Sequence, residues 1–286
     1  MKQLNILRTL GTFVLSLLMT VSLVAQDRIA YVSSTADPYP WGQTGLITNQ
    51  MNMVFGNGNW EDLRFETVDP DDLFSNDFCL VYLEGSSFGA NGLNSFIQAN
   101  VTAMENYVNR GGRLLINAAP NQGGNINYGF GGVVLQYPNF QSSVTAFDPD
   151  HPIWQGPFTP TATSMTGNSY GHGVVCPAGM NATPLIQGGG QDVAIEFFTG
   201  AGLVIFGGMT TTNWHQPQPA GDNVRMNILH YLKNASLDGE VLKPLSGGTS
   251  VPTMTQWGKF LFGLVVLTFG VVAVYNIYTR KEEIWG

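Results

Sequence analysis

The chain has 286 residues, enough for one sizeable domain with appendages. Only 11% of the residues are charged, while 35 are glycine and 15 are proline, a composition more typical of a loop-rich extracellular module than of a cytosolic enzyme. Residues 26–250 hold 7 lysines and arginines against 18 aspartates and glutamates, a net charge of −11. Such an acidic region argues against nucleic acid and anionic lipid head groups as partners.

The amino terminus predicts export. Residues 1–25 carry Lys2 and Arg8, followed by an apolar run from Leu10 to Ala25. This pattern is typical of a secretory signal peptide, so we expect signal peptidase to cleave after Ala25. The alternative is an uncleaved anchor helix, for which the apolar run is short.

The first half of the chain predicts alternating strands and helices. Residues 78–83 form a continuous apolar run, as in a central parallel strand. The apolar spacing over 101–108 predicts a helix that stops before Gly111-Gly112 and leads into a strand at 113–117. The other elements expected here are strands at 27–33 and 63–68, a helix at 45–55, and a helix that begins after Pro70 with Asp71 and Asp72 in its first turn.

The second half of the chain is less regular. A hairpin is expected from residues 192–198 and 203–208, which are joined by a glycine-containing turn. Residues 223–232 predict a closing helix, and 236–250 read as a polar linker. The remaining elements expected in this half are short strands at 132–137 and 143–147 and a turn at 148–153.

Residues 27–234 together resemble the class I glutamine amidotransferase-like fold in a divergent form. The resemblance rests on Gly111-Gly112-Arg113-Leu114-Leu115-Ile116 with the helix before it, on the turn Asp150-His151-Pro152-Ile153, and on the strand at 203–208 with the loop that follows. It implies an α/β domain over residues 26–235, built on a three-layer, doubly wound, mostly parallel sheet of the flavodoxin type.

The position of the family nucleophile is the main departure from that resemblance. Family enzymes place a cysteine on a tight elbow after the strand that corresponds to 113–117, where this chain has Ala118 and Ala119. The loops after parallel strands form the ligand crevice of open α/β sheets, and this one lacks a nucleophile. The resemblance therefore implies a domain without amide-transfer activity.

One motif leaves a catalytic alternative open. Gly85-Ser86-Ser87-Phe88-Gly89 matches the Gly-x-Ser-x-Gly nucleophile elbow and follows a strand, but Ala90-Asn91-Gly92 does not resemble the start of the helix that an elbow requires. Asp148 or Asp192 as the acid and His215 as the base would complete the order of a hydrolase. Glu84 and His215, expected in the same crevice, are a second acid–base pair. We predict no catalytic set, and the candidates for one are Ser87, Glu84 and His215.

The same crevice is where we expect a ligand to bind. Asn117, Asn213, Trp214 and His215 follow the ends of two strands and are the predicted ligand-binding residues. We predict no metal and no cofactor, and Cys79 and Cys176 leave a disulfide open. Aromatic residues expected in exposed loops would suit stacking on sugars: Tyr39, Trp41, Tyr128, Phe130, Trp154, Tyr170 and Trp214.

The carboxyl terminus, residues 251–286, predicts a membrane anchor. Residues 260–278 are almost entirely apolar and long enough to span a bilayer. Arg280 and Lys281 follow directly, which favours a cytoplasmic end and leaves the domain outside that membrane.

The flank of this span carries the most specific motif of the chain. It resembles the IPTL-type carboxyl-terminal sorting domain of Gram-negative bacteria through Val251, Pro252, Thr253 and Met254, and then Gln256, Trp257 and Gly258, before the helix and its basic residues. The resemblance implies that a membrane protease of the exosortase class recognises the chain and removes the anchor. The alternative is an ordinary single-span membrane protein.

These patterns predict an exported bacterial surface protein, anchored by its carboxyl-terminal helix or released after processing. We expect its domain to bind a glycan or another surface protein, or to serve a structural role. The alternative is a secreted hydrolase that uses Ser87 or the Glu84/His215 pair.

Overall fold

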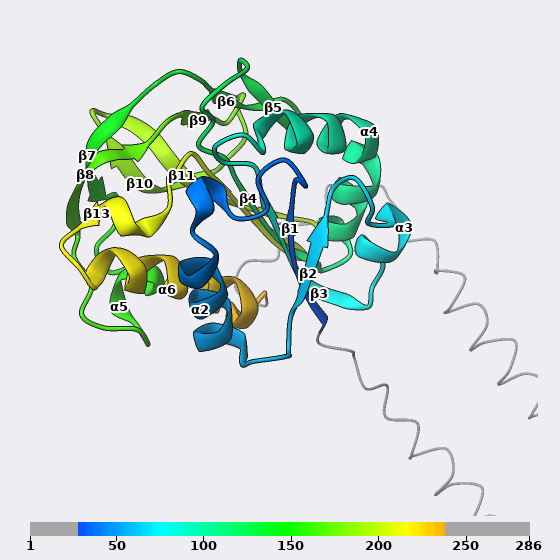
Figure 1. Ribbon diagram of the computed structural model, residues 1–286, viewed down its shortest axis with the longest axis horizontal. Coiled ribbons are helices and arrows are strands. Elements are labelled where there is room, and N and C mark those ends of the chain that lie inside the picture. The colour runs from blue at the N-terminus through cyan, green and yellow to red at the C-terminus, as the bar shows by residue number, and fades with distance from the viewer. Residues whose placement is uncertain (1–27, 238–286) are drawn as a thin grey trace, which may run out of the picture. The chain divides into compact units, whose positions relative to one another are not determined.

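The computed structural model describes residues 28–237 (Figure 1). The predicted signal peptide, the sorting motif at 251–258 and the membrane span at 260–278 lie outside these residues. No helix within the described range combines the length and apolar character needed to cross a membrane.

The domain is built on one large mixed sheet with the strand order β13-β8-β7-β10-β11-β12-β4-β3-β1-β2. All neighbours from β2 to β12 pair in parallel. The order of these five strands is the 2-1-3-4-5 order of flavodoxin-like folds. Their bounds are Arg28–Ser33 for β1, Glu61–Arg64 for β2, Phe78–Glu84 for β3, Arg113–Asn117 for β4 and Gly202–Gly207 for β12.

From β12 outward the pairings within this sheet are antiparallel, so the prediction of a mostly parallel sheet is wrong. The expected hairpin of β11 and β12 is confirmed, and it is where the strand direction changes. Glycine-rich and polar strands with little apolar alternation then extend the sheet, and β8, β10 and β13 among them were not predicted. The antiparallel strands are β11 (Gln191–Thr199), β10 (Thr183–Gly188), β7 (Gln141–Ala146), β8 (Ser164–Gly171) and β13 (His215–Gln216).

Helices cover both faces of the sheet, so the predicted three layers are confirmed (Figure 1). The expected helices are present, and α4 begins eleven residues before the predicted 101–108 segment. The strand predicted at 63–68 is instead β2, shifted toward the amino terminus. The helices are α2 (Thr44–Phe55), α3 (Pro70–Leu73), α4 (Ala90–Asn109), α5 (Pro152–Gln155) and α6 (Ala220–Asn234), with short 3-10 turns η1 (Pro40–Gly42) and η2 (Thr212–Trp214).

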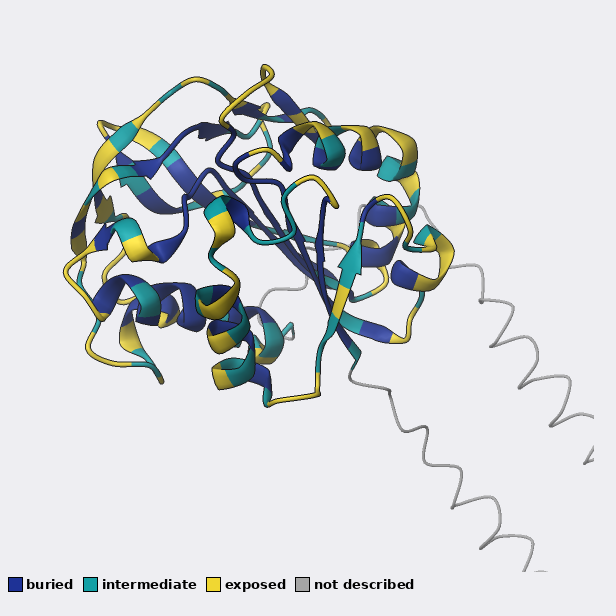
Figure 2. Ribbon diagram, in the orientation of Figure 1, coloured by how far each residue is buried: buried dark blue, intermediate teal, exposed yellow. Residues whose placement is uncertain are grey.

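Two apolar cores lie on opposite faces because side chains alternate along each strand. In β4, Leu114 and Ile116 join the core under α4, while Leu115 joins the core under α2 and α6. Figure 2 shows that most residues of the central strands are buried. A small second sheet, β5-β6-β9, packs beside α4; its strands are β5 (Ile126–Gly129), β6 (Val133–Gln136) and β9 (Val174–Cys176).

The tight turn between β11 and β12 depends on glycine. A Cβ on Gly202 would lie 2.1 Å from the backbone oxygen of Val108 and 2.4 Å from that of Gly112. Backbone atoms this close cannot be displaced without moving α4 or β4. The Gly111-Gly112 turn and the hairpin therefore fit together only because Gly202 has no side chain.

Candidate functional site

The carboxyl ends of β3, β4 and β12 meet at one edge of the sheet, as predicted. The register places Glu84 beside Asn117, and Asn117 beside Gly207. A Cβ on Gly207 would lie 2.7 Å from Asn117 Oδ1. The absence of a side chain at Gly207 therefore gives the Asn117 amide its room.

Asn117 is the centre of the polar contacts at this edge. Its Oδ1 accepts a hydrogen bond from the Met209 backbone N at 3.0 Å, and its Nδ2 donates to Met209 O at 2.9 Å and to Glu84 Oε2 at 3.1 Å. Asn117 is fully buried and Glu84 is 2% exposed. Glu84 and Asn117, both expected in the crevice, are therefore in contact, and this internal contact joins the loop after β12 to β3.

A residue that sequence analysis missed, Arg225 on α6, completes this cluster. Arg225 Nη1 donates to Tyr82 Oη at 2.8 Å and lies 3.9 Å from Glu84 Oε2, and Nη2 donates to Thr210 O at 3.0 Å. Tyr82 Oη in turn donates to Glu84 Oε2. We call Tyr82, Glu84, Asn117, Thr210 and Arg225 the buried network.

Burial sets the protonation of the buried network. It raises the pKa of Tyr82 well above the ordinary value, with Glu84 adding to the shift, so the Tyr82 hydroxyl keeps the proton it donates. Burial acts to lower the pKa of Arg225, but Tyr82 and Glu84 outweigh it and the pKa is raised. A charged guanidinium therefore stays paired with Glu84 inside the protein.

The two serines of the Gly85–Gly89 motif take different roles. Ser86 Oγ accepts from the Ala119 backbone N at 2.8 Å, which ties β3 to the loop after β4. Ser87 has a left-handed φ of 55°, and its buried Oγ has no hydrogen-bond partner among the described residues. The chain enters α4 at Ala90, so the expectation that Ala90-Asn91-Gly92 would not begin a helix is wrong. The strand–elbow–helix arrangement is therefore present.

His215 does not complete a catalytic set with Ser87. Its Nε2 lies 3.1 Å from Thr210 Oγ1, and its ring stacks on Tyr170 with centroids 3.9 Å apart. His215 is 1% exposed, and burial, helped by Arg225, lowers its pKa to about 3. The imidazole is therefore neutral and enclosed, and it is linked to Glu84 through Thr210 and Arg225.

Two further histidines, His172 and His151, make separate contacts within the protein. His172 Nδ1 donates to Pro120 O at 2.7 Å, and His151 Nε2 lies 3.4 Å from Glu196 Oε1. Within residues 28–237, no three His, Cys, Asp or Glu side chains gather as metal ligands would. Cys79 and Cys176 do not form a disulfide.

Above the buried network, four rings from separate loops make edge-to-face contacts in a row. Phe140 and His172 have centroids 5.0 Å apart, His172 and Trp41 are 5.6 Å apart, and Trp41 and Trp214 are 4.8 Å apart. We call these four residues the aromatic row. Of the predicted ligand-binding residues, Trp214 and the exposed Asn213 lie at this surface, whereas Asn117 and His215 lie beneath it.

The aromatic row has polar atoms that the protein leaves unpaired. The indole N–H groups of Trp41 and Trp214 have no hydrogen-bond partner among the described residues. Because Nδ1 of His172 carries the proton given to Pro120, its Nε2 remains an acceptor. Burial lowers the pKa of His172, although the Pro120 contact opposes the shift, so the ring is neutral near pH 7.

Trp41 is held in an unusual backbone conformation, with φ 54° and ψ 28° inside η1. A large residue in the left-handed region costs on the order of 1–3 kcal/mol and persists only where its surroundings fix it. Such outliers gather at ligand sites more often than elsewhere. The loop after β1 therefore places Trp41 against His172 and Trp214 at an energetic cost.

Several of the predicted loop aromatics are buried instead. Tyr128, Phe130, Trp154 and Tyr170 are core residues, while Phe140 is 57% exposed and was not predicted. No sequence signal marks Phe140, because its place in the aromatic row depends on the loop between β6 and β7. Arg225 did carry a signal: it stands three and four residues before Ile228 and Leu229, on the apolar face of α6.

Comparisons with known proteins add solved structures of similar topology. A scan against models of protein families and a search of curated proteins find no match. A cytoplasmic protein from Salmonella typhimurium aligns at 12% identity with a TM-score of 0.43, over 72% of this chain and 98% of its own. A ThuA-like protein from Bacteroides uniformis aligns at 12% identity with a TM-score of 0.45, over 73% of this chain and 91% of its own.

An enzyme is among the structures of similar topology. A β-galactosidase from Rahnella aligns at 13% identity with a TM-score of 0.38, over 72% of this chain and 31% of its own. At such scores the likeness says nothing of activity. The fold class therefore rests on the strand order itself, an α/β domain with a mixed sheet.

Proposed function

We propose that the domain is a non-catalytic binding module of an exported protein, and that it binds neutral glycans along the aromatic row. The observation that carries this proposal is the contrast at one edge of the sheet. The groups suited to acid–base chemistry are enclosed and paired with one another, whereas the rings above them keep unpaired N–H and N groups.

The chemistry of the aromatic row favours a sugar ligand. Aromatic faces pack against the apolar faces of sugar rings, and indole N–H groups and a neutral imidazole bond to hydroxyls. The described residues carry 6 lysines and arginines against 15 aspartates and glutamates, which disfavours an anionic polymer.

Export and sorting belong to the same proposal. The signal peptide over residues 1–25 and the anchor with its sorting motif over 251–286 would place the domain at the cell surface, held by its helix or released by a protease of the exosortase class. A divergent class I glutamine amidotransferase-like ancestry is consistent with the 2-1-3-4-5 strand order and with the buried Ala118 and Ala119 at the family's nucleophile position.

The test is calorimetric titration of the purified protein with linear neutral oligosaccharides of glucose, mannose or galactose. We expect at least one series to bind. Trp41→Ala and Trp214→Ala should each weaken the binding affinity about tenfold or more, since the stacking of a ligand ring on an aromatic side chain contributes on the order of 1–3 kcal/mol. Trp60→Ala is the matched control, because Trp60 lies outside the aromatic row and bonds Asn52. Equal affinity in the Trp41→Ala variant would contradict the proposal.

The left-handed backbone of Ser87 supports a second candidate function, that of a serine hydrolase with Ser87 as its nucleophile. The left-handed φ, the unpaired Oγ and the helix that follows are features of nucleophile elbows. A fluorophosphonate probe tests it: covalent mass on Ser87 that disappears in Ser87→Ala would favour the enzyme. No labelling of Ser87 is expected, since the side chain is 1% exposed and His215 is bonded elsewhere.

A further inference from the structure

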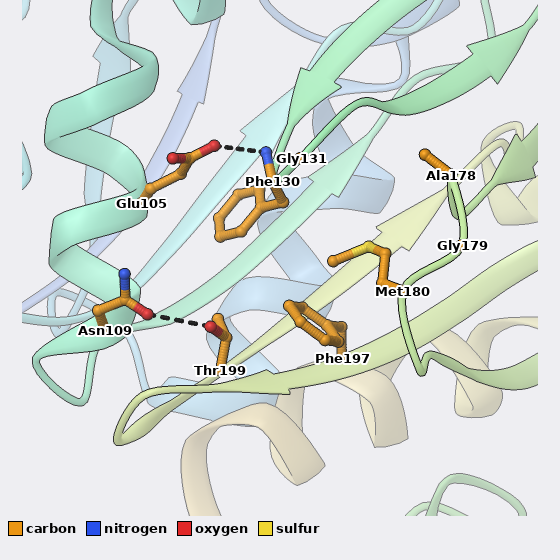
Figure 3. A pocket seen from close by; sticks show the side chains of 9 residues that line it. All are labelled: Glu105, Asn109, Phe130, Gly131, Ala178, Gly179, Met180, Phe197 and Thr199. Atoms are coloured by element: carbon orange, nitrogen blue, oxygen red, sulfur yellow. Dashed lines mark hydrogen bonds between the residues drawn. The ribbon is translucent and has the colours of Figure 1, made fainter. Parts of the chain in front are cut away.

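A separate pocket of about 420 Å³ opens beside the carboxyl-terminal half of α4. Figure 3 shows its walls, which come from four segments far apart in the chain: α4, the turn between β5 and β6, the loop after β9, and β11. The rings of Phe130 and Phe197 and the thioether of Met180 lie around a common space. The apolar part of the pocket thus consists of aromatic rings and a polarisable thioether.

One charged side chain, Glu105, lines this pocket. Its Oε1 accepts from the Phe130 backbone N at 2.5 Å, which fixes the carboxylate and leaves Oε2 without a partner among the described residues. Along the same side of the pocket, Asn109 Oδ1 accepts from Thr199 Oγ1 at 3.0 Å. Arg110, the nearest cation in sequence, is turned away and bonds Asn76 and Phe74. Within residues 28–237, the Glu105 carboxylate that lines the pocket therefore forms no ion pair.

The backbone around the pocket is strained. Four non-glycine residues among the described ones have left-handed φ angles, and two of them, Phe130 at 50° and Ala178 at 49°, line this pocket. Each such conformation costs on the order of 1 kcal/mol or more. The hydrogen bond from the Phe130 backbone N to Glu105 stabilises the left-handed conformation of Phe130. The position of the Phe130 ring and that of the carboxylate therefore depend on each other.

These features select a class of ligand. A carboxylate without a counter-charge repels anions and attracts cations, and the net acidic domain adds to that attraction. Aromatic faces attract cations through their quadrupole and also cover apolar groups. We propose that the pocket binds an ammonium group on a short apolar stem, with the ammonium beside Glu105 and the stem against Phe197 and Met180. This inference is independent of the glycan proposal.

The same chemistry has two sources, a trimethylammonium head group and the primary amine of a lysine side chain. Choline and n-butylammonium are the probes for the two, and the neutral isostere of choline, with a tert-butyl group in place of trimethylammonium, is the reference. We titrate each into the full-length protein and follow the methyl signals of Met180 and its neighbours by NMR. At least one cation should bind about tenfold more tightly than the neutral isostere.

Three variants make the result decisive. Glu105→Gln keeps an oxygen for the Phe130 N–H but removes the charge, and should weaken the cation about tenfold while leaving the neutral isostere unchanged. Phe197→Leu keeps an apolar wall without a ring and should weaken the cation alone. Asp150→Asn removes the same charge from an exposed loop and should change nothing.

Any of three results would overturn the proposal. The first is that neither cation binds the wild-type protein while its thermal unfolding shows it to be folded. The second is that the neutral isostere binds as tightly as the cations, and the third is that Glu105→Gln keeps full affinity; either of these would make the pocket an apolar cavity without charge recognition.

Discussion

The buried network and the aromatic row lie at the same edge of the sheet but differ in whether their polar groups bond one another. In the buried network, a carboxylate, an amide, a phenol and a guanidinium bond one another and are sealed from water. In the aromatic row, the rings pack edge to face, and the indole N–H groups have no hydrogen-bond partner within residues 28–237. The polar residues of the buried network thus bond one another and hold the loops, whereas the rings of the aromatic row are where we propose that a ligand binds.

The largest effect should come from breaking the ion pair of the buried network. Arg225→Met leaves Glu84 buried without its cation, and a buried charge that loses its partner costs about 3–5 kcal/mol of unfolding free energy. Urea denaturation measures this loss. The double variant with Glu84→Gln should be more stable than the sum of the single changes predicts, because the uncompensated charge is gone. A loss under about 1 kcal/mol for Arg225→Met would mean that the pair has little structural role.

Acid should destabilise the buried network through His215. Its pKa falls from 6.5 in the unfolded chain to about 3 in the folded protein, so below pH 6.5 only the unfolded state takes up this proton. The unfolding free energy should therefore fall by up to about 1.4 kcal/mol per pH unit between pH 6.5 and 3, with no contribution from His215 above that window. Since carboxylates titrate in the same range, the measurement is the difference between the wild type and His215→Gln. Equal slopes for the two proteins would contradict the assignment.

A smaller loss of unfolding free energy is expected from removing the Asn117 amide, which contacts Met209 and Glu84. Asn117→Ala removes the partners of the Met209 N–H and of Glu84, and an unsatisfied buried group costs about 1–3 kcal/mol. Denaturation of this variant should be compared with that of Asn121→Ala in the exposed loop nearby, where a change within about 0.5 kcal/mol is expected. A similar loss in both variants would assign the effect to the loop rather than to the buried amide.

The smallest effect on stability should come from the aromatic row. Trp41→Ala retains a left-handed backbone that only glycine adopts without cost, so Trp41→Gly should be more stable than Trp41→Ala by about 1 kcal/mol. Both variants should lose the glycan affinity. Thermal unfolding compares the stabilities of the two variants. If Trp41→Ala is more stable than Trp41→Gly, the backbone of Trp41 is not strained.

Local patterns along the chain were enough to predict the parallel half of the sheet. Apolar runs such as Phe78–Leu83 and the glycines that end α4 specify local structure directly, so the strands, the helices and the meeting of Glu84 with Asn117 at one edge were predicted. The antiparallel strands β8, β10 and β13 were not, because they are short, polar or glycine-rich and are stabilised by the neighbours that pair with them.

The contacts of the predicted site residues depend on long-range packing, which local patterns do not reveal. Arg225 is over a hundred residues from Glu84 in the chain, and its charge reaches the carboxylate only because α6 packs on the sheet. Burial lowers the pKa of His215, and this burial also depends on segments that no local pattern connects. The same is true of the aromatic row, whose four rings come from separate loops. Spacing along the chain fixes which residues lie at an edge of the sheet, whereas long-range packing fixes which of them are enclosed and which are exposed.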